Sequence, residues 1–215
     1  MLKPIEMVTV KDQIKNILRD AILSNEFKRG DALNVGELAE KLGVSTMPVR
    51  EALSVLERDG LVELRPRKTA IVLGADEKYV REYYQIRALL EGEAAVLASN
   101  RADEEIPDLR KALEECADMC DTEDFALYSQ QNVVFHQTIW EMSGNRRLQV
   151  MLRDLWMSKS ITQTRYTVAD MEDTARCHRE IARYILEHRA EDARKAMESH
   201  LLEGMKVVLR QFTQN

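Results

Sequence analysis

Three of the four histidines in this 215-residue chain lie on apolar faces of different predicted helices. These are His136, His178 and His200, whereas His188 lies between two charged residues where a helix is expected to end. Burial disfavours the charged imidazolium, and neutral imidazoles are common ligands of zinc and related ions. The pattern fits two interpretations, a divalent metal site or three separate hydrogen-bonded core histidines.

Two further polar side chains are placed to join such a site. Asn132 precedes His136 by four residues, so its amide oxygen lies one helical turn away on the same face. Arg87 precedes Glu91 by the same interval on another predicted helix. A guanidinium binds carboxylates in a bidentate manner, which makes Arg87 a candidate anchor for an anionic effector. The alternative for Arg87 is a surface ion pair with Glu91.

Residues 34–53 have the pattern of a helix-turn-helix. Asn34 and Glu37 resemble a capping box, and Gly43 suits the positive φ of a tight turn between two short helices. Such proteins read DNA bases with the first residues of the second helix. The predicted DNA-contacting residues of that helix are Ser45, Thr46, Met47 and Arg50.

A basic hairpin follows the second helix. Residues 60–64 and 70–73 are predicted to be two short strands. The turn between them carries Arg65, Arg67 and Lys68, which we expect to contact phosphates or the minor groove. Upstream, a first helix is predicted from apolar residues at helical spacing, namely Val10, Ile14, Ile17, Leu18, Ala21 and Ile22. Residues 1–74 are therefore predicted to form a winged helix-turn-helix DNA-binding domain.

The rest of the chain, residues 75–215, is predicted to be an all-α bundle of six or seven helices. The expected helices span 77–99, 104–121, 124–143, 146–166, 171–188 and 190–212. The apolar face expected for the first of them carries Tyr79, Tyr83, Ile86, Leu90, Ala94 and Leu97. The fold class is thus mainly α, with a small N-terminal β-hairpin.

Charge differs between these two parts of the chain. The formal net charge is −6, but residues 1–74 carry 12 Lys and Arg against 11 Asp and Glu. The acidity therefore lies in residues 75–215, and nonspecific DNA affinity should be low and salt-sensitive. No apolar run is long enough for a membrane span, no signal peptide is evident, and three cysteines suggest no disulfide framework. We expect a cytoplasmic protein with no membrane partner.

These motifs resemble a known family in order and spacing. Residues 44–53 (VSTMPVREAL) are similar to the winged-helix signature of the GntR family of bacterial transcription regulators. The bundle resembles the ligand-sensing helical domain, called the FCD domain, of the FadR subfamily. Its matching blocks are 86–91 (IRALLE), 135–139 (FHQTI), 143–145 (SGN), 178–181 (HREI) and 200–201 (HL).

The resemblance implies a homodimeric transcription regulator, a repressor in many members, that binds a palindromic operator on double-stranded DNA. A small metabolite, often an organic acid, enters the bundle and changes operator affinity. The family commonly holds a divalent metal with three histidines and one carboxylate, and His136, His178 and His200 match the histidine positions. Asn132 stands where the carboxylate is usual, which weakens the expected zinc or nickel site.

The DNA-reading end also departs from the family pattern. Thr46 and Gly36 occupy positions where arginines are usual, and Thr69 replaces the usual wing glycine, whereas Arg50 is kept. Because arginines read guanine in a bidentate manner, the family's common operator core should not apply to this chain.

Two other functions use the same histidines. A metal could staple the bundle without any effector role, since closed and ligand-open sites use the same residues. A metal-dependent hydrolase is the other alternative. The chain has no His-Glu-x-x-His pair, no predicted pair of inward carboxylates near the histidines and no nucleophile elbow, so we expect no enzyme.

Overall fold

The computed structural model describes residues 9–66, 69–102, 125–156 and 167–210, together with residues 111, 113 and 115. The chain divides into two compact units, and the boundary in the sequence falls between Tyr79 and Val80. Each unit is described by itself below. Within the described residues, no helix is sufficiently long and apolar to cross a membrane.

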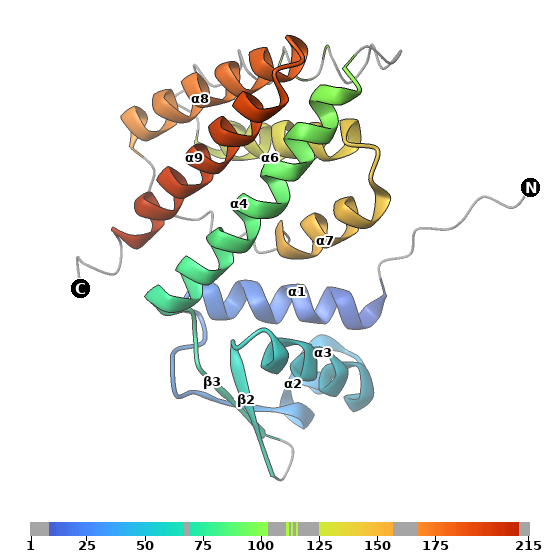
Figure 1. Ribbon diagram of the computed structural model, residues 1–215. Coiled ribbons are helices and arrows are strands. Elements are labelled where there is room, and N and C mark those ends of the chain that lie inside the picture. Colours follow the sequence, from blue (N-terminus) through green and yellow to red (C-terminus); the bar gives the residue numbers. More distant parts are fainter. Residues whose placement is uncertain are drawn as a thin grey trace, which may run out of the picture. The chain divides into compact units, whose positions relative to one another are not determined.

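The N-terminal unit is a winged helix-turn-helix, as predicted (Figure 1). Its helices are α1 (Val10–Leu23), α2 (Val35–Leu42) and α3 (Thr46–Arg58), and its wing strands are β2 (Val62–Arg65) and β3 (Thr69–Val72). A third strand, β1 (Ala32–Asn34), was not predicted and pairs antiparallel with β3, so the sheet order is β1-β3-β2. Three residues are too few for a periodic signal, and only the partner strand defines β1.

Turn residues set the geometry between α2 and α3. The Asn34 side chain accepts hydrogen bonds from the backbone N–H groups of Gly36 and Glu37, and so caps α2. Gly43 ends α2 with a φ of 66°, the left-handed conformation that glycine adopts without strain. Ser45 occupies the N-cap of α3 but makes no side-chain capping bond.

The face predicted for α1 was partly wrong. Ile14, Leu18 and Ile22 are buried in the core, but Val10 and Ile17 are exposed. The stem of Arg19 is buried instead, and its guanidinium pairs with Asp59 at the end of α3. A long basic side chain can cover core surface with its methylene groups, which an apolar periodicity does not reveal.

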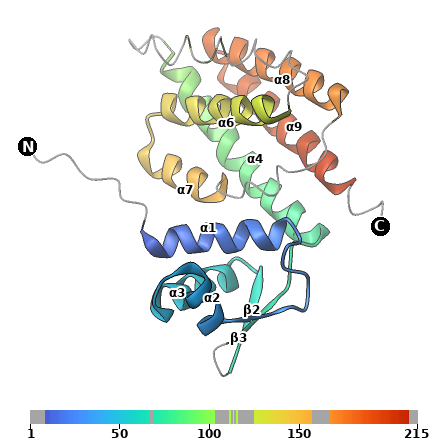
Figure 2. The same cartoon turned by 180° about the vertical axis from the view of Figure 1, so that it is seen from behind.

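The second unit is built from five long helices in the described residues (Figure 2). These are α4 (Glu77–Asn100), α6 (Phe125–Met142), α7 (Arg146–Trp156), α8 (Val168–Leu186) and α9 (Ala190–Leu209). A short turn at residues 187–189 joins α8 to α9, and both views show these two helices side by side. The helix predicted at 104–121 and the end of the one predicted at 146–166 lie outside the described residues.

Two predictions for the bundle needed correction. Helix α8 begins at Val168, earlier than predicted, because Thr167 and Asp170 form a reciprocal capping box. The predicted face of α4 was partly wrong, since Tyr83 and Ala94 are buried as predicted but Ile86 is exposed. The buried stripe of α4 contains the charged residues Arg87 and Glu91 in its middle. Its members are Val80, Tyr83, Tyr84, Arg87, Ala88, Glu91, Gly92, Ala94, Ala95, Ala98 and Ser99.

Candidate functional site

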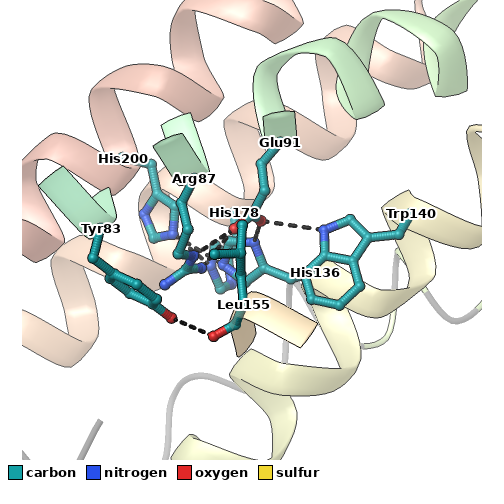
Figure 3. Close-up of polar contacts among 8 residues, drawn as sticks. All are labelled: Tyr83, Arg87, Glu91, His136, Trp140, Leu155, His178 and His200. Carbon is teal, nitrogen blue, oxygen red and sulfur yellow. Dashed lines mark hydrogen bonds and ion pairs between the residues drawn. The ribbon is translucent and has the colours of Figure 1, made fainter. Parts of the chain in front are cut away.

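Three helices bring the three predicted histidines together inside the bundle (Figure 3). His136 comes from α6, His178 from α8 and His200 from α9, and their exposed fractions are only 1%, 0% and 9%. The α8–α9 turn makes this possible, because His178 and His200 lie at similar chain distances on either side of it. The ligand atoms of all three lie within 4.8 Å of one another.

The imidazole rings meet through their Nε2 atoms. His200 Nε2 lies 3.2 Å from His136 Nε2 and 3.3 Å from His178 Nε2. Burial lowers the pKa of His178 well below its usual value, and burial together with His136 lowers the pKa of His200 to about 3. These two imidazoles are therefore neutral at physiological pH, and their lone pairs are available to a cation.

One buried nitrogen in this cluster has no hydrogen-bond partner among the described residues. This nitrogen is Nδ1 of His178, whose ring stacks on Phe135 with centroids 3.8 Å apart. Three close Nε2 atoms cannot all satisfy one another, because a hydrogen bond between two of them needs a proton on one and a lone pair on the other, and facing lone pairs repel. A cation shared by the three Nε2 atoms would accept a lone pair from each, so this set of imidazoles fits a divalent metal.

A buried carboxylate contacts His136 on the Nδ1 side of the ring, away from the other two histidines. Glu91 on α4 has an exposed fraction of 0%, and its Oε2 lies 2.5 Å from His136 Nδ1 and 3.3 Å from Trp140 Nε1. Its Oε1 accepts a hydrogen bond from Arg87 Nε at 2.8 Å. Burial by itself would raise the pKa of Glu91, but Arg87 and His136 outweigh it and hold the pKa at about 2.

Three aromatic rings surround the guanidinium of Arg87. Its guanidinium lies 3.9 Å from the centroid of the Trp156 ring, with Tyr83 and Tyr84 within 5.6 Å. The Tyr83 hydroxyl donates to the Leu155 carbonyl, which ties α4 to the end of α7. Burial opposes the charge of Arg87, but Glu91 outweighs burial and raises the pKa of Arg87.

The Arg87–Glu91 pair differs from the predicted surface alternative. The two side chains do pair, but both are buried. Arg87 Nη2 lies 2.7 Å from Glu91 Oε1 but makes no hydrogen bond of good geometry to any described residue, so guanidinium N–H groups remain for a further acceptor. Sequence reasoning missed Glu91 as a site residue. The signal was available as a stripe of Tyr83, Arg87 and Glu91 at four-residue intervals on α4.

Asn132 is less closely involved than the three histidines. It lies on α6 one turn before His136 and is half-buried, but its amide makes no hydrogen bond within the described part of the chain. The role of Asn132 as a metal ligand stays a prediction, because the arrangement of the three histidines does not test it.

The predicted DNA-contacting side chains of α3 lie on the surface of the N-terminal unit. Ser45, Thr46, Met47 and Arg50 are all exposed, and Met47 reaches an exposed fraction of 64%. Among the described residues, Arg50 has no ion-pair partner, which leaves its guanidinium available. In the wing, Arg65 is exposed and pairs with Glu63 at 2.7 Å. The two other predicted wing contacts, Arg67 and Lys68, lie outside the described residues.

Both units match known protein families. Residues 10–72 match the bacterial regulatory proteins of the gntR family, and residues 82–203 match the FCD domain. The chain belongs to the GntR family of FCD-containing transcription regulators. The FCD match includes all three clustered histidines, together with Arg87 and Glu91.

Individual relatives agree with this assignment. The chain is 37% identical to the HTH-type transcriptional regulator YdhC of Bacillus subtilis over 65% of its length, and 35% identical to the gluconate operon transcriptional repressor of Bacillus licheniformis over 57%. It spans 63% and 50% of those two relatives. The structure of Escherichia coli McbR/YncC has the same fold, with a TM-score of 0.71, 22% identity, and coverage of 96% of this chain and 100% of that one.

Proposed function

We propose that this GntR-family regulator senses a small carboxylic acid through a divalent metal held in the bundle, and that the acid changes its affinity for operator DNA. The observation that carries the proposal is the convergence of three buried imidazole Nε2 atoms beside a buried guanidinium. Names of relatives such as the gluconate operon repressor support a regulatory role and disfavour an enzyme.

Zinc or nickel is the metal that these ligands would suit. Imidazole is a preferred ligand of both ions, and three imidazoles leave a coordination position for a ligand from solution. His136, His178 and His200 would hold the ion, and Asn132 would be a weak neutral ligand if it binds. When bound, the ion would supply a positive charge that attracts a carboxylate.

Arg87 would hold the other end of the acid. Its guanidinium retains N–H groups, and carboxylates bind guanidinium groups through paired hydrogen bonds. The low dielectric of the buried site would strengthen that attraction. A monocarboxylate could be shared between the metal and Arg87, whereas a dicarboxylate could place one group on each.

On DNA, α3 would enter the major groove of one half-site of a palindrome. Arg50 is the exposed arginine of that helix nearest its N-terminal turn, and Ser45, with its hydroxyl free of capping, would contact a phosphate. A palindromic site calls for a homodimer with two-fold symmetry. Ile86 and Leu89, both exposed and apolar on α4, would suit contact with a second copy.

The test is operator binding with and without metal and candidate acids. Operators would be selected from a random DNA pool, and affinity measured at fixed salt with zinc and a panel of small carboxylic acids. We expect one acid to change affinity at least about tenfold, which corresponds to a preference of about 1.4 kcal/mol for one state. Bound metal without any acid response would favour a metal-stapled bundle, and turnover of an acid derivative would favour a hydrolase.

A further inference from the structure

The two oxygens of Glu91 face two different partners (Figure 3). Oε1 accepts from Arg87 Nε at 2.8 Å, and Oε2 lies 2.5 Å from His136 Nδ1. Trp140 Nε1 donates to the same Oε2 at 3.3 Å. A carboxylate with no solvent exposure is strongly disfavoured unless it is paired, and here the pairing spans two helices.

The contact with Glu91 decides which nitrogen of His136 carries the proton. An ionised carboxylate can only accept hydrogen bonds, so His136 Nδ1 must be the donor. An imidazole that binds a metal through one nitrogen and carries its proton on Nδ1 has its lone pair on Nε2, and this is the nitrogen that lies 3.2 Å from His200 Nε2. Glu91 therefore turns the metal-binding nitrogen of His136 toward the other two histidines.

Arg87 and Trp140 fix the carboxylate in this position. Arg87 occupies one oxygen, and Trp140 holds the other beside His136. Glu91 itself lies on the Nδ1 side of His136, away from the nitrogen that faces the cluster, so it is not placed as a ligand of the ion. Outer carboxylates of this kind orient metal-binding imidazoles and make them more basic.

We infer that Glu91 is a positioning residue of the metal site, holding His136 in the Nδ1–H tautomer with its lone pair directed at the ion. The inference rests on the proposed metal site. It also gives Arg87 a second role, because the guanidinium that would bind an acid is the one that orients Glu91. Glu91 makes His136 a more basic ligand through the contact at Nδ1. This partly offsets the absence of a carboxylate at Asn132.

Zinc affinity of the full chain tests the inference, measured by competition with a chromogenic chelator at neutral pH. Glu91→Gln keeps the size of the side chain but removes its charge, and we expect zinc affinity to fall about 10–100-fold. The matched control is Glu93→Gln, on the same helix, whose carboxylate pairs with Arg194 outside the site. That variant should stay within about twofold of the unmodified protein.

The outcomes separate the inference from the proposed function. If the unmodified protein binds no zinc, the proposed metal site fails and the inference fails with it. If it binds zinc and Glu91→Gln binds equally tightly, only the inference is overturned. Far-UV circular dichroism would establish that both variants are folded.

A second measurement needs no variant and covers the case in which Glu91→Gln does not fold. Nitrogen-15 NMR of the zinc-loaded protein reports the tautomer of each histidine. We expect His136 to show a protonated Nδ1 and a metal-bound Nε2. A metal-bound Nδ1 with a protonated Nε2 would overturn the inference.

Discussion

The two units of this regulator place their candidate functional side chains in opposite environments. In the winged helix, Thr46, Met47 and Arg50 are exposed, while the main core cluster of that unit is made of apolar side chains. In the bundle, the buried set includes Glu91 and His178. The contrast follows from the ligand expected for each unit. DNA is too large to enter a domain and must bind at the surface, whereas an ion and a small acid can be bound in the interior.

This contrast has an energetic consequence. Exposed side chains are hydrated in the folded and unfolded states alike, so replacing them should change DNA binding with little effect on stability. Buried charges and imidazoles lose hydration on folding and depend on their partners for compensation. Changes in the bundle should therefore alter ligand binding and stability together.

The largest expected effect is loss of metal binding at the proposed site in His178→Ala. Removing one of three ligands should lower zinc affinity more than about a hundredfold. This is a larger loss than is usual when the residue removed only orients a ligand and does not bind the metal itself. Elemental analysis of the purified protein and chelator competition would measure it. Operator affinity without effector should change little, because Arg50 is untouched. Equal zinc content in the variant and the unmodified protein would contradict the site.

The next effect is a pH dependence of the metal-free bundle. The folded-state pKa values of His178 and His200 are lowered from 6.5, so below that pH the unfolded chain takes up protons that the folded chain does not. Stability should therefore be greatest above pH 6.5 and should fall as the pH drops toward the folded-state values. The two groups together give a slope of up to about 2.7 kcal/mol per pH unit.

Urea unfolding of metal-free protein between pH 7.5 and 5 would measure this slope. His200→Gln removes one of the two groups and should reduce the slope by about half. A free energy of unfolding that stays constant from pH 6.5 to 5 would mean that the imidazoles are not buried as described.

A smaller effect is expected on the exposed side of the contrast. Arg50→Ala should cost roughly 1–3 kcal/mol of operator affinity and relax base preference at one symmetric position of each half-site. The matched control is Arg58→Ala, an exposed arginine at the opposite end of α3. If both variants lose operator affinity equally and keep the same base preference, the N-terminal turn of α3 does not read the DNA bases. The melting temperature should be unchanged in both.

The smallest expected effect comes from Asn132→Asp. A carboxylate one turn before His136 would add a charged ligand, and zinc affinity should rise about tenfold, or about 1.4 kcal/mol. Isothermal titration with zinc would detect it. An unchanged zinc affinity would place Asn132 outside the coordination sphere and leave the three histidines as the predicted ligands among the described residues.

The helix-turn-helix was predictable because its signals are local. Asn34 caps α2 and Gly43 ends it, and each acts within a few residues of its own position. The bundle was less predictable because its faces depend on packing. Helix α4 exposes Ile86 and Leu89 while it buries Arg87 and Glu91, and hydrophobicity alone assigns those faces the other way.

The sequence by itself determined that three histidines lie on interior faces of three helices, since a 3.6-residue period places each beside apolar neighbours. Only the tertiary structure decided that they meet, because the α8–α9 turn and the packing of α6 set their separation. Tertiary structure likewise decided the partner of Glu91. A four-residue interval identifies Arg87 as its neighbour on α4, but His136 is 45 residues away and becomes a partner only through packing of α6 on α4.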